Sequence, residues 1–247
     1  MKHAEYLRLS PDGGVAILFI HGILGSPRHF DFLLPVIPRN WSVRCLLLEG
    51  HGKGVQDFSR SSMAAWRAQV TQAVEELSAH HKKVLLVGHS MGTLLAIDQA
   101  VVRPEAVTGM FLLAAPLRVF LRPRLLPDLI RVWLNQPKMG NPVSEAFLEA
   151  CSIRQDWRFW LYLGWIPRFW ELLMECRRIR KLLHRLTIPC EAYQSRRDEM
   201  VSLRACRDLT PWTNVTVLDY SNHFYYGPED RERLILAFIR FCKKNGD

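Results

Sequence analysis

Short apolar runs that alternate with amphipathic stretches constrain the fold of this 247-residue chain more than any other feature. The runs expected to form β-strands are residues 15–20, 43–48, 84–88, 109–115, 190–195 and 215–220. The stretches expected to form helices are residues 63–81, 91–103 and 230–244. Three of the runs are apolar at nearly every position, which is typical of strands covered on both faces. The alternation predicts an α/β fold with a mainly parallel, doubly wound sheet.

One long segment interrupts this alternation. Residues 117–186 contain no convincing strand and are rich in Trp, Arg and Pro, so they are expected to form several helices. An insertion of this size between two strands of one sheet is typical of a lid over the edge where strands end. The sequence therefore predicts an α/β core made of residues 1–116 and 187–247, with a helical lid at 117–186.

A serine lies between two glycines where the third expected strand meets a helix. The pattern is Gly88-x-Ser90-x-Gly92, within VGHSMGT. A sharp strand-to-helix turn exposes the central hydroxyl at the carboxyl end of the sheet, and small flanking residues let the chain pass. The next amide, that of Met91, then points from a helix N-terminus. Ser90 is therefore interpreted as a nucleophile, and the alternative is a glycine-rich turn whose serine caps a helix.

A serine hydroxyl needs a base that takes its proton. In the chain order expected for this turn the acid follows the serine and the base comes last. Two histidines follow Ser90 in the sequence, His184 and His223. His184 lies in a basic stretch of the expected lid and is interpreted as solvated. His223 follows the last expected strand, so its loop should reach the carboxyl edge beside Ser90, and His223 is the predicted base.

The acid that orients this base should follow another strand. Asp198 lies just past the strand expected at 190–195, where a carboxylate can hold the imidazole in the right tautomer. Glu199, its neighbour, and Asp219, four residues before His223, are competing candidates. Asp219 falls within an expected strand, so its side chain could face elsewhere. Asp198 is the preferred acid.

The stretch FIHGILGSPRHF at residues 19–30 predicts a second oxyanion donor. A buried strand ends in His-Gly, and Gly22 lets the backbone bend sharply. The amide of Ile23 could then point at the same spot as that of Met91, giving two donors to a tetrahedral oxyanion. His21 and His51, each in a turn after a strand, are interpreted as structural.

These motifs carry a resemblance to a known family. In order, HGILGSP, EGHGKG, GHSMG, RRDEMV and SNHF resemble the α/β-hydrolase fold, and especially its carboxylesterase and monoacylglycerol-lipase-like members. The resemblance spans nearly the whole chain outside the lid. It implies Ser90, Asp198 and His223 as a catalytic triad, with the amides of Ile23 and Met91 as the oxyanion hole. It implies no metal and no organic cofactor.

The expected lid gathers tryptophan and positive charge. Four tryptophans occur at Trp157, Trp160, Trp165 and Trp170, interleaved with arginines. The first interpretation is that these rings pack on the main domain while the arginines stay in water. A second makes Trp157, Trp160 and Trp165 an apolar wall for the acyl chain of a substrate. A third makes the lid an amphipathic surface that touches an anionic membrane, because residues 117–186 contain thirteen Lys and Arg but only six Asp and Glu.

Composition excludes several other classes. The formal net charge is +9, but no basic arm and no zinc-finger spacing points to nucleic acid. Six cysteines without a CxxC pair indicate reduced thiols. The first residues show no apolar signal core, and the run at 15–20 is too short for a membrane span, so a cytoplasmic protein is expected.

The sequence as a whole predicts a serine hydrolase acting on a small carboxylic ester through an acyl-enzyme on Ser90. One alternative is a non-hydrolytic member of the fold, such as a lyase of menaquinone synthesis, in which the triad acts as a base. Thioesters are another candidate substrate class within the same chemistry. A third alternative is a binding module that uses the hydrolase fold as a receptor.

Overall fold

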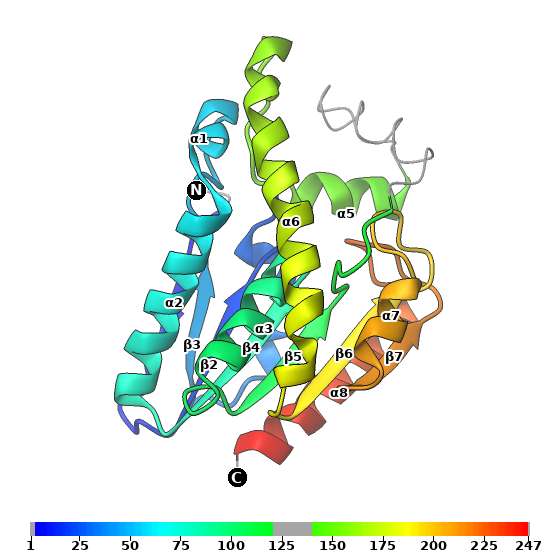
Figure 1. The fold of residues 1–247 in the computed structure, drawn as a ribbon. Helices are drawn as coiled ribbons and strands as arrows, with labels where there is room; N and C mark the ends of the chain where they lie inside the picture. The colour runs from blue at the N-terminus through cyan, green and yellow to red at the C-terminus, as the bar shows by residue number, and fades with distance from the viewer. Residues whose placement is uncertain (1–2, 121–139, 247) are drawn as a thin grey trace.

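A seven-stranded sheet forms the centre of the molecule (Figure 1). The computed structural model describes residues 3–120 and 140–246. The strands are β1 (Tyr6–Arg8), β2 (Val15–Ile20), β3 (Ser42–Leu46), β4 (Lys83–His89), β5 (Gly109–Leu113), β6 (Cys190–Ser195) and β7 (Asn214–Leu218). Their order is β1-β3-β2-β4-β5-β6-β7, and every neighbouring pair is parallel except β1 with β3. The predicted mainly parallel sheet is therefore confirmed.

Helices cover both faces of this sheet. In order they are α1 (Val55–Arg60), α2 (Met63–His80), α3 (Met91–Val102), α5 (Pro142–Ala150), α6 (Ile166–Leu182), α7 (Arg204–Leu209) and α8 (Pro228–Gly246). Helices α2, α3 and α6 lie on one face, and α8 lies on the other (Figure 1). None of the helices in the described part of the chain is long and apolar enough to cross a bilayer.

Alternate residues of the central strands feed two separate cores, as the pleat requires. In β2, Ala16, Leu18 and Ile20 pack in the cluster with α2, α3 and α6. Their neighbours Val15, Ile17 and Phe19 pack in the cluster with α8. All six side chains are buried, which explains why the sequence of this strand is apolar at every position. This two-sided burial is the doubly wound arrangement that the sequence predicts.

The strand ends differ from the predicted bounds where the chain turns toward the carboxyl edge of the sheet. The strand expected at 109–115 stops at Leu113, because Ala114 adopts a left-handed φ of 53°. The strand expected at 215–220 stops at Leu218, so Asp219 lies beyond it. The short strand β1 was not predicted from the sequence, since its three residues are largely exposed at the sheet edge.

The segment predicted as a lid includes part of the core. Helix α6 buries Leu172, Cys176 and Ile179 in the same cluster as α2 and α3. Its first turns extend beyond that contact, at the top of the molecule in Figure 1. Residues 121–139 of the segment lie outside the described residues. The division at 117 and 186 stays a prediction, and the second half of α6 packs as a core helix.

A buried cluster of charged side chains joins α2, α3 and α6. Arg178 Nη2 lies 2.6 Å from Asp98 Oδ1 and 2.6 Å from Glu175 Oε1. Arg67 Nη2 lies 2.9 Å from Glu175 Oε2. Both carboxylates are buried, whereas both guanidinium groups reach solvent. The cluster fixes α6 against the helix that begins at Met91.

Candidate active site

Ser90 stands in a strained turn between β4 and α3. Its φ of 51° and ψ of −123° lie in a region that L-residues rarely adopt. A Cβ at Gly92 would lie 1.9 Å from the carbonyl oxygen of Ile20, and one at Gly88 would lie 2.7 Å from the Cα of Thr93. Glycine is therefore required on both sides of Ser90. The Thr93 hydroxyl donates a hydrogen bond of 2.7 Å to the Ser90 carbonyl and braces the turn.

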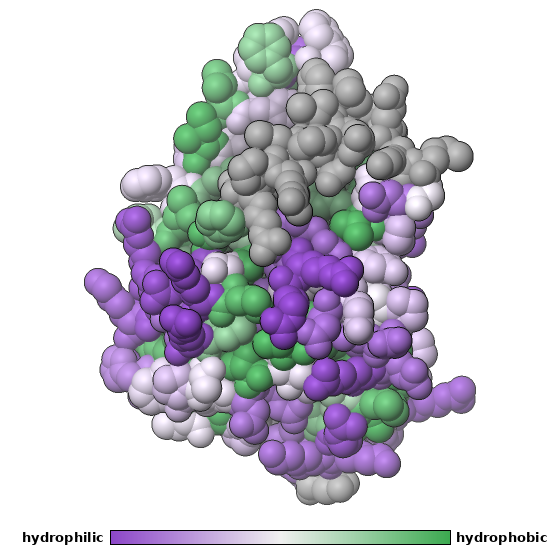
Figure 2. Space-filling view, turned by 90° about the vertical axis from the view of Figure 1, so that its right-hand side faces the viewer, coloured by the Kyte–Doolittle hydropathy of each residue, from purple (hydrophilic) through white to green (hydrophobic). Residues whose placement is uncertain are grey.

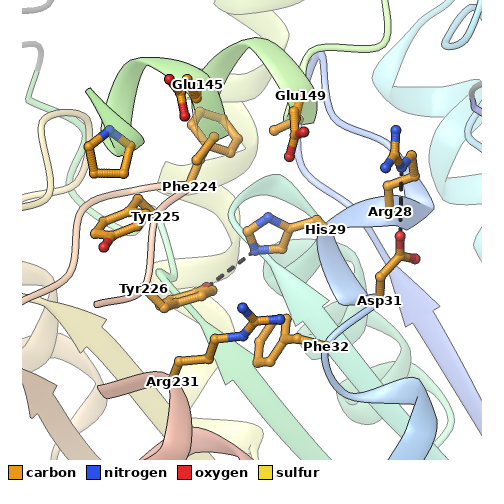
Figure 3. A pocket seen from close by; sticks show the side chains of 13 residues that line it. Arg28, His29, Asp31, Phe32, Glu145, Glu149, Phe224, Tyr225, Tyr226 and Arg231 are labelled. Carbon is orange, nitrogen blue, oxygen red and sulfur yellow. Dashed lines mark hydrogen bonds and ion pairs between the residues drawn. The ribbon is translucent and has the colours of Figure 1, made fainter. Parts of the chain in front are cut away.

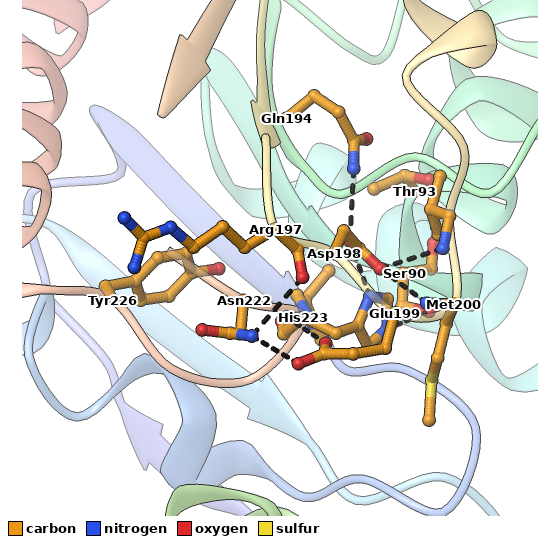
Figure 4. Close-up of polar contacts among 12 residues, drawn as sticks. Ser90, Thr93, Gln194, Arg197, Asp198, Glu199, Met200, Asn222, His223 and Tyr226 are labelled. Carbon is orange, nitrogen blue, oxygen red and sulfur yellow. Dashed lines mark hydrogen bonds and ion pairs between the residues drawn. The ribbon is translucent and has the colours of Figure 1, made fainter. Parts of the chain in front are cut away.

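Ser90, His223 and Asp198 form one hydrogen-bonded chain (Figure 4). His223 Nε2 lies 3.0 Å from Ser90 Oγ, and His223 Nδ1 lies 2.9 Å from Asp198 Oδ2. A carboxylate accepts only, so Nδ1 carries the proton and Nε2 accepts from the serine hydroxyl. All three side chains are at least nine-tenths buried. They come from the loops after β4, β7 and β6, which end at the same edge of the sheet.

The carboxylate of Asp198 is held by further donors. Oδ1 accepts hydrogen bonds of 2.8 Å from the backbone amides of Met200 and Val201. Oδ2 accepts a bond of 3.0 Å from the Gln194 side-chain amide, in addition to His223. These four donors fix the orientation of the carboxylate toward the imidazole. The sequence analysis did not identify Gln194, although it faces inward near the end of a predicted strand.

The two competing acids have other partners. Glu199 accepts hydrogen bonds from the backbone amide of His223, at 3.2 Å, and from the side-chain amide of Asn222. It therefore holds the loop that carries the imidazole and does not contact the ring nitrogens. Asp219 is paired with Arg196 at the surface, where both side chains are about half exposed. Asp198 is the carboxylate that contacts the His223 ring.

The loop after β2 passes directly over Ser90. A Cβ on Gly22 would lie 2.8 Å from the Ser90 Cβ, and the Gly25 amide donates a 3.0 Å hydrogen bond to the Gly22 carbonyl. Ile23 lies inside this tight turn. Met91 is the first residue of α3, where backbone amides have no acceptor within the helix. Ile23 thus follows a residue packed against Ser90, and Met91 follows Ser90 itself, while their role as oxyanion donors stays a prediction.

His21 and His51 brace these loops, as interpreted from the sequence. His21 Nδ1 donates to the Gly22 carbonyl at 2.8 Å, and its Nε2 accepts from the Leu48 amide at 3.0 Å. His51 Nε2 accepts from the Leu24 amide at 3.1 Å. Burial lowers the pKa of His51 to about 4 and lowers the pKa of His21 well below its usual value. Both rings are neutral, with one nitrogen donating and the other accepting.

Two further histidines lie behind the proposed base. His89 Nε2 donates a 3.0 Å hydrogen bond to the His223 carbonyl, and the His29 ring stacks on His89 with centroids 3.7 Å apart. His29 Nε2 lies 3.2 Å from the Tyr226 hydroxyl. Burial lowers the pKa of His29 to about 3. The sequence analysis missed this stack, since His29 and His89 are distant in the chain and only the fold brings them together.

A cavity of about 360 Å³ is lined by Phe224, the residue after His223 (Figure 3). The 3₁₀ helix η1 (Pro27–Phe30), helix α5 and residues 224–226 form its walls. Phe224 also lines a smaller hollow that reaches His223, together with Phe147. The Phe224 ring packs against the Phe147 ring with centroids 5.1 Å apart. Phe224 is thus the aromatic residue that lines both the larger cavity and the hollow at His223.

Most of the predicted tryptophan wall faces solvent. Trp157 is 77% exposed, and Trp160 and Trp170 are also exposed. Trp165 packs edge-on against Phe58 with centroids 5.0 Å apart. Neither of the two hollows near His223 is lined by a tryptophan. The contacts therefore match the packing interpretation for Trp165 alone and give no support to an acyl-chain wall.

The arrangement supplies the parts of a nucleophilic site. It has a serine hydroxyl, a base within hydrogen-bonding distance, a carboxylate that orients the base, and two backbone amides near the nucleophile. Within residues 3–120 and 140–246, no group of three or more His, Cys, Asp or Glu side chains is placed to hold a metal ion.

Comparisons with known proteins give one family and several partial relatives. The chain matches the alpha/beta hydrolase family over residues 17–240. It is 28% identical over 95 residues to a thermostable monoacylglycerol lipase of Bacillus sp. (strain H-257), a match covering 38% of each chain. It is 30% identical over 106 residues to a putative 2-succinyl-6-hydroxy-2,4-cyclohexadiene-1-carboxylate synthase of Bacillus subtilis, covering 41% of this chain and 37% of that one. The chain thus matches less than half the length of each of these relatives.

A solved structure shares the fold over nearly its full length. It comes from work on two metagenome-derived lipolytic enzymes, LipS and LipT, and is 24% identical to this chain. The superposition has a TM-score of 0.73 and covers 96% of this chain and 97% of the other.

Proposed function

Because the chain belongs to the alpha/beta hydrolase family, we propose that it hydrolyses carboxylic esters through an acyl-enzyme on Ser90. The observation that carries the proposal is the hydrogen-bonded chain from Ser90 Oγ through His223 to Asp198, with distances of 3.0 and 2.9 Å. The likeness to a monoacylglycerol lipase over part of its length supports an ester as substrate.

In the first half of the reaction, His223 Nε2 takes the proton of Ser90 as Oγ attacks the ester carbonyl. The carbonyl oxygen becomes an oxyanion, which the amides of Ile23 and Met91 stabilise. Asp198 keeps the proton on Nδ1 and stabilises the imidazolium. The imidazolium then protonates the alcohol oxygen, the ester C–O bond breaks, and the alcohol leaves.

In the second half, water replaces the alcohol. His223 takes a proton from the water, whose oxygen attacks the acyl carbon bound to Ser90 Oγ. The tetrahedral adduct collapses, the proton returns to Oγ, and the carboxylic acid is released. The segment 117–186 acts in this proposal as a lid over the carboxyl edge of the sheet.

A lyase is the second candidate, supported by the partial likeness to the Bacillus subtilis synthase. In a lyase the same serine and histidine would remove a proton from the substrate, and no acyl-enzyme would accumulate. A thioester would instead pass through the same acyl-enzyme as an ester. Comparing kcat/KM for an ester and a thioester with the same acyl group shows which of the two the protein prefers.

A fluorophosphonate probe and a p-nitrophenyl ester test the proposal together. Wild-type protein should be labelled covalently and should turn the ester over, and Ser90→Ala should lose both properties. Ser78→Ala, on the surface of α2, is the matched control and should keep both. Retention of ester turnover within about tenfold of wild type by Ser90→Ala would overturn the assignment of the nucleophile, since removing it should cost orders of magnitude.

A further inference from the structure

Large apolar side chains are exposed where the chain enters α6. We call this surface the aromatic tip, and its residues are Trp157, Phe159, Trp160, Leu163, Ile166 and Trp170. Trp157 and Phe159 are 77% and 71% exposed. In Figure 1 the first turn of α6 is the uppermost part of the molecule, and Figure 2 shows hydrophobic side chains gathered at that upper end. So large an exposed apolar patch is typical of a surface that binds something.

Positive charge follows on the same face of α6. Arg177 and Lys181 stand seven and eleven residues after Trp170, so helical periodicity puts all three on one side. Arg185 continues this line just past the helix. We call these three cations the basic band. None of them has a carboxylate partner among residues 3–120 and 140–246, and all three are exposed.

Other arginines in the same region differ from the basic band because they are paired with carboxylates. Arg158 is paired with Asp156, Arg168 with Glu171, and Arg178 with Glu175. Three acidic residues of this region, Asp156, Glu171 and Glu175, are thus already paired with arginines. The three cations of the basic band differ from these arginines in having no such partner among the described residues.

The spacing of tip and band suits a lipid surface. A helix rises about 1.5 Å per residue, so Trp170 and Arg177, seven residues apart, are separated by roughly 10 Å along the axis. Amphipathic surfaces bury their apolar residues about 5–10 Å into the boundary between headgroups and acyl chains, with cations at the headgroups. Tryptophan is favoured at that boundary because its ring is apolar and its N–H is polar.

We propose that the aromatic tip and the basic band dock this protein on a bilayer surface that carries anionic lipids. Anionic headgroups supply the charge that the basic band lacks, and the tip enters the acyl region. Two copies of the chain packed through this face would bring the unpaired cations of both copies to one interface. Charge complementarity therefore favours the lipid surface over a second copy.

Vesicle flotation of the full chain tests the proposal. The probes are vesicles of phosphatidylcholine alone and of phosphatidylcholine mixed with phosphatidylglycerol. Binding to the mixed vesicles should be about a hundredfold tighter and should weaken as salt rises, since each of the three cations near an anionic surface contributes about a factor of five. Ser90→Ala should bind like wild type, so the outcome is independent of the catalytic proposal.

Variants separate the two parts of the surface. Arg177→Gln, Lys181→Gln and Arg185→Gln together should weaken binding to mixed vesicles about a hundredfold and remove the preference for phosphatidylglycerol. Lys243→Gln with Lys244→Gln, at the end of α8, is the control for charge and should bind like wild type.

The tip is tested in the same assay. Trp157→Ala with Trp170→Ala should weaken binding to both kinds of vesicle, whereas Trp212→Ala, which is exposed elsewhere, should not. Wild-type protein that fails to float with mixed vesicles overturns the proposal, as does equal binding by wild type and the tip variant. A dimer in sedimentation velocity that the tip variant abolishes, without any flotation, assigns the surface to a second copy instead.

Discussion

Gly22 and Ser90 are packed so closely that a side chain on Gly22 would collide with the serine, because an added Cβ would lie 2.8 Å from the Ser90 Cβ. The loop after β2 and the turn after β4 are therefore packed in direct contact. In the proposed oxyanion hole, this closeness places Ile23, the next residue, near the serine. The absence of a side chain at position 22 is thus a requirement of the proposed oxyanion hole.

Gly22→Ala should lower kcat/KM for ester hydrolysis by about a hundredfold to a thousandfold, the usual effect of losing one oxyanion donor. The added methyl must push the loop away from Ser90, and the Ile23 amide moves with it. Gly14→Ala is the control, because no atom lies within 4 Å of a Cβ there. Steady-state kinetics on a p-nitrophenyl ester measures both. Near-normal activity in Gly22→Ala would remove Ile23 from the proposed oxyanion hole.

Asp198→Asn should lower kcat about ten-thousand-fold, because an amide can no longer hold the proton on Nδ1 of His223. Asp219→Asn should leave kcat unchanged, since Asp219 is paired with Arg196 at the surface. Glu199→Gln should fall between the two, because Glu199 holds the backbone amide of His223 and the side chain of Asn222 but not the imidazole. An inactive Asp219→Asn together with an active Asp198→Asn would show that the acid is misassigned.

Phe224→Ala should change the preference for acyl chain length. Phe224 lines both the larger cavity and the hollow at His223, so a smaller side chain joins the two spaces. The larger cavity is lined by charged residues such as Glu145 and Glu149, so the apolar contact that the variant removes is the Phe224 ring itself. Apolar contacts discriminate by about 1–3 kcal/mol per methylene, so the ratio of rates for long and short esters should change several-fold. Phe159→Ala, in the aromatic tip, is the control. Identical rate ratios in wild type and Phe224→Ala would show that substrate does not reach the larger cavity.

The free energy of unfolding should fall as the solution is acidified below pH 6.5. Burial lowers the pKa of His51 from 6.5 to about 4, so below pH 6.5 the unfolded chain binds a proton that the folded chain does not. This contribution is complete above pH 6.5 and is lost as the pH falls toward 4, amounting to about 3 kcal/mol.

Urea unfolding across this pH range measures the effect. His51→Gln should make the dependence of the unfolding free energy on pH less steep, with the remainder coming from His21 and His29, whose pKa values burial also lowers. His184→Gln, at an exposed position, should leave the dependence as in wild type. An unchanged pH dependence in His51→Gln would show that His51 has the same pKa in the folded and the unfolded chain.

Glu175→Gln should destabilise the fold by about 2 kcal/mol, because charged hydrogen bonds to Arg67 and Arg178 become weaker ones at a buried site. The loss stays moderate since both arginines reach solvent. Glu232→Gln, on the exposed side of α8, is the control. The midpoint of urea unfolding measures both, and equal midpoints would show that the buried pairs contribute no net stability.

The sheet and the hydrogen-bonded residues Ser90, His223 and Asp198 can be predicted from the sequence for physical reasons. Central strands are buried on both faces, so their apolar runs stand out, and β2 was predicted with its observed bounds. Parallel strands end at one edge, so polar residues just after them meet there. That rule and the expected chain order of serine, acid and base lead to Ser90, Asp198 and His223, with Glu199 left as a competing acid.

Other features depend on contacts that no local pattern records. The edge strand β1 is short and mostly exposed, so it lacks an apolar run. Trp165 packs on α1 while Trp157 faces solvent, although both occur in the same aromatic stretch. Glu199 resembles Asp198 as a carboxylate after a strand, and only the direction of its side chain distinguishes its role.

Helix α6 is attached to the rest of the molecule at two places along its length. Its second half is bound to α3 through the ion pair of Arg178 with Asp98. Its first turn is bound to α1 and the residue after it, because Arg168 donates to the backbone carbonyls of Ser59 and Ser61. Helix α3 starts at Met91, one residue past Ser90. Helix α6 therefore connects two separate parts of the core, one of which is the helix that begins beside the proposed nucleophile.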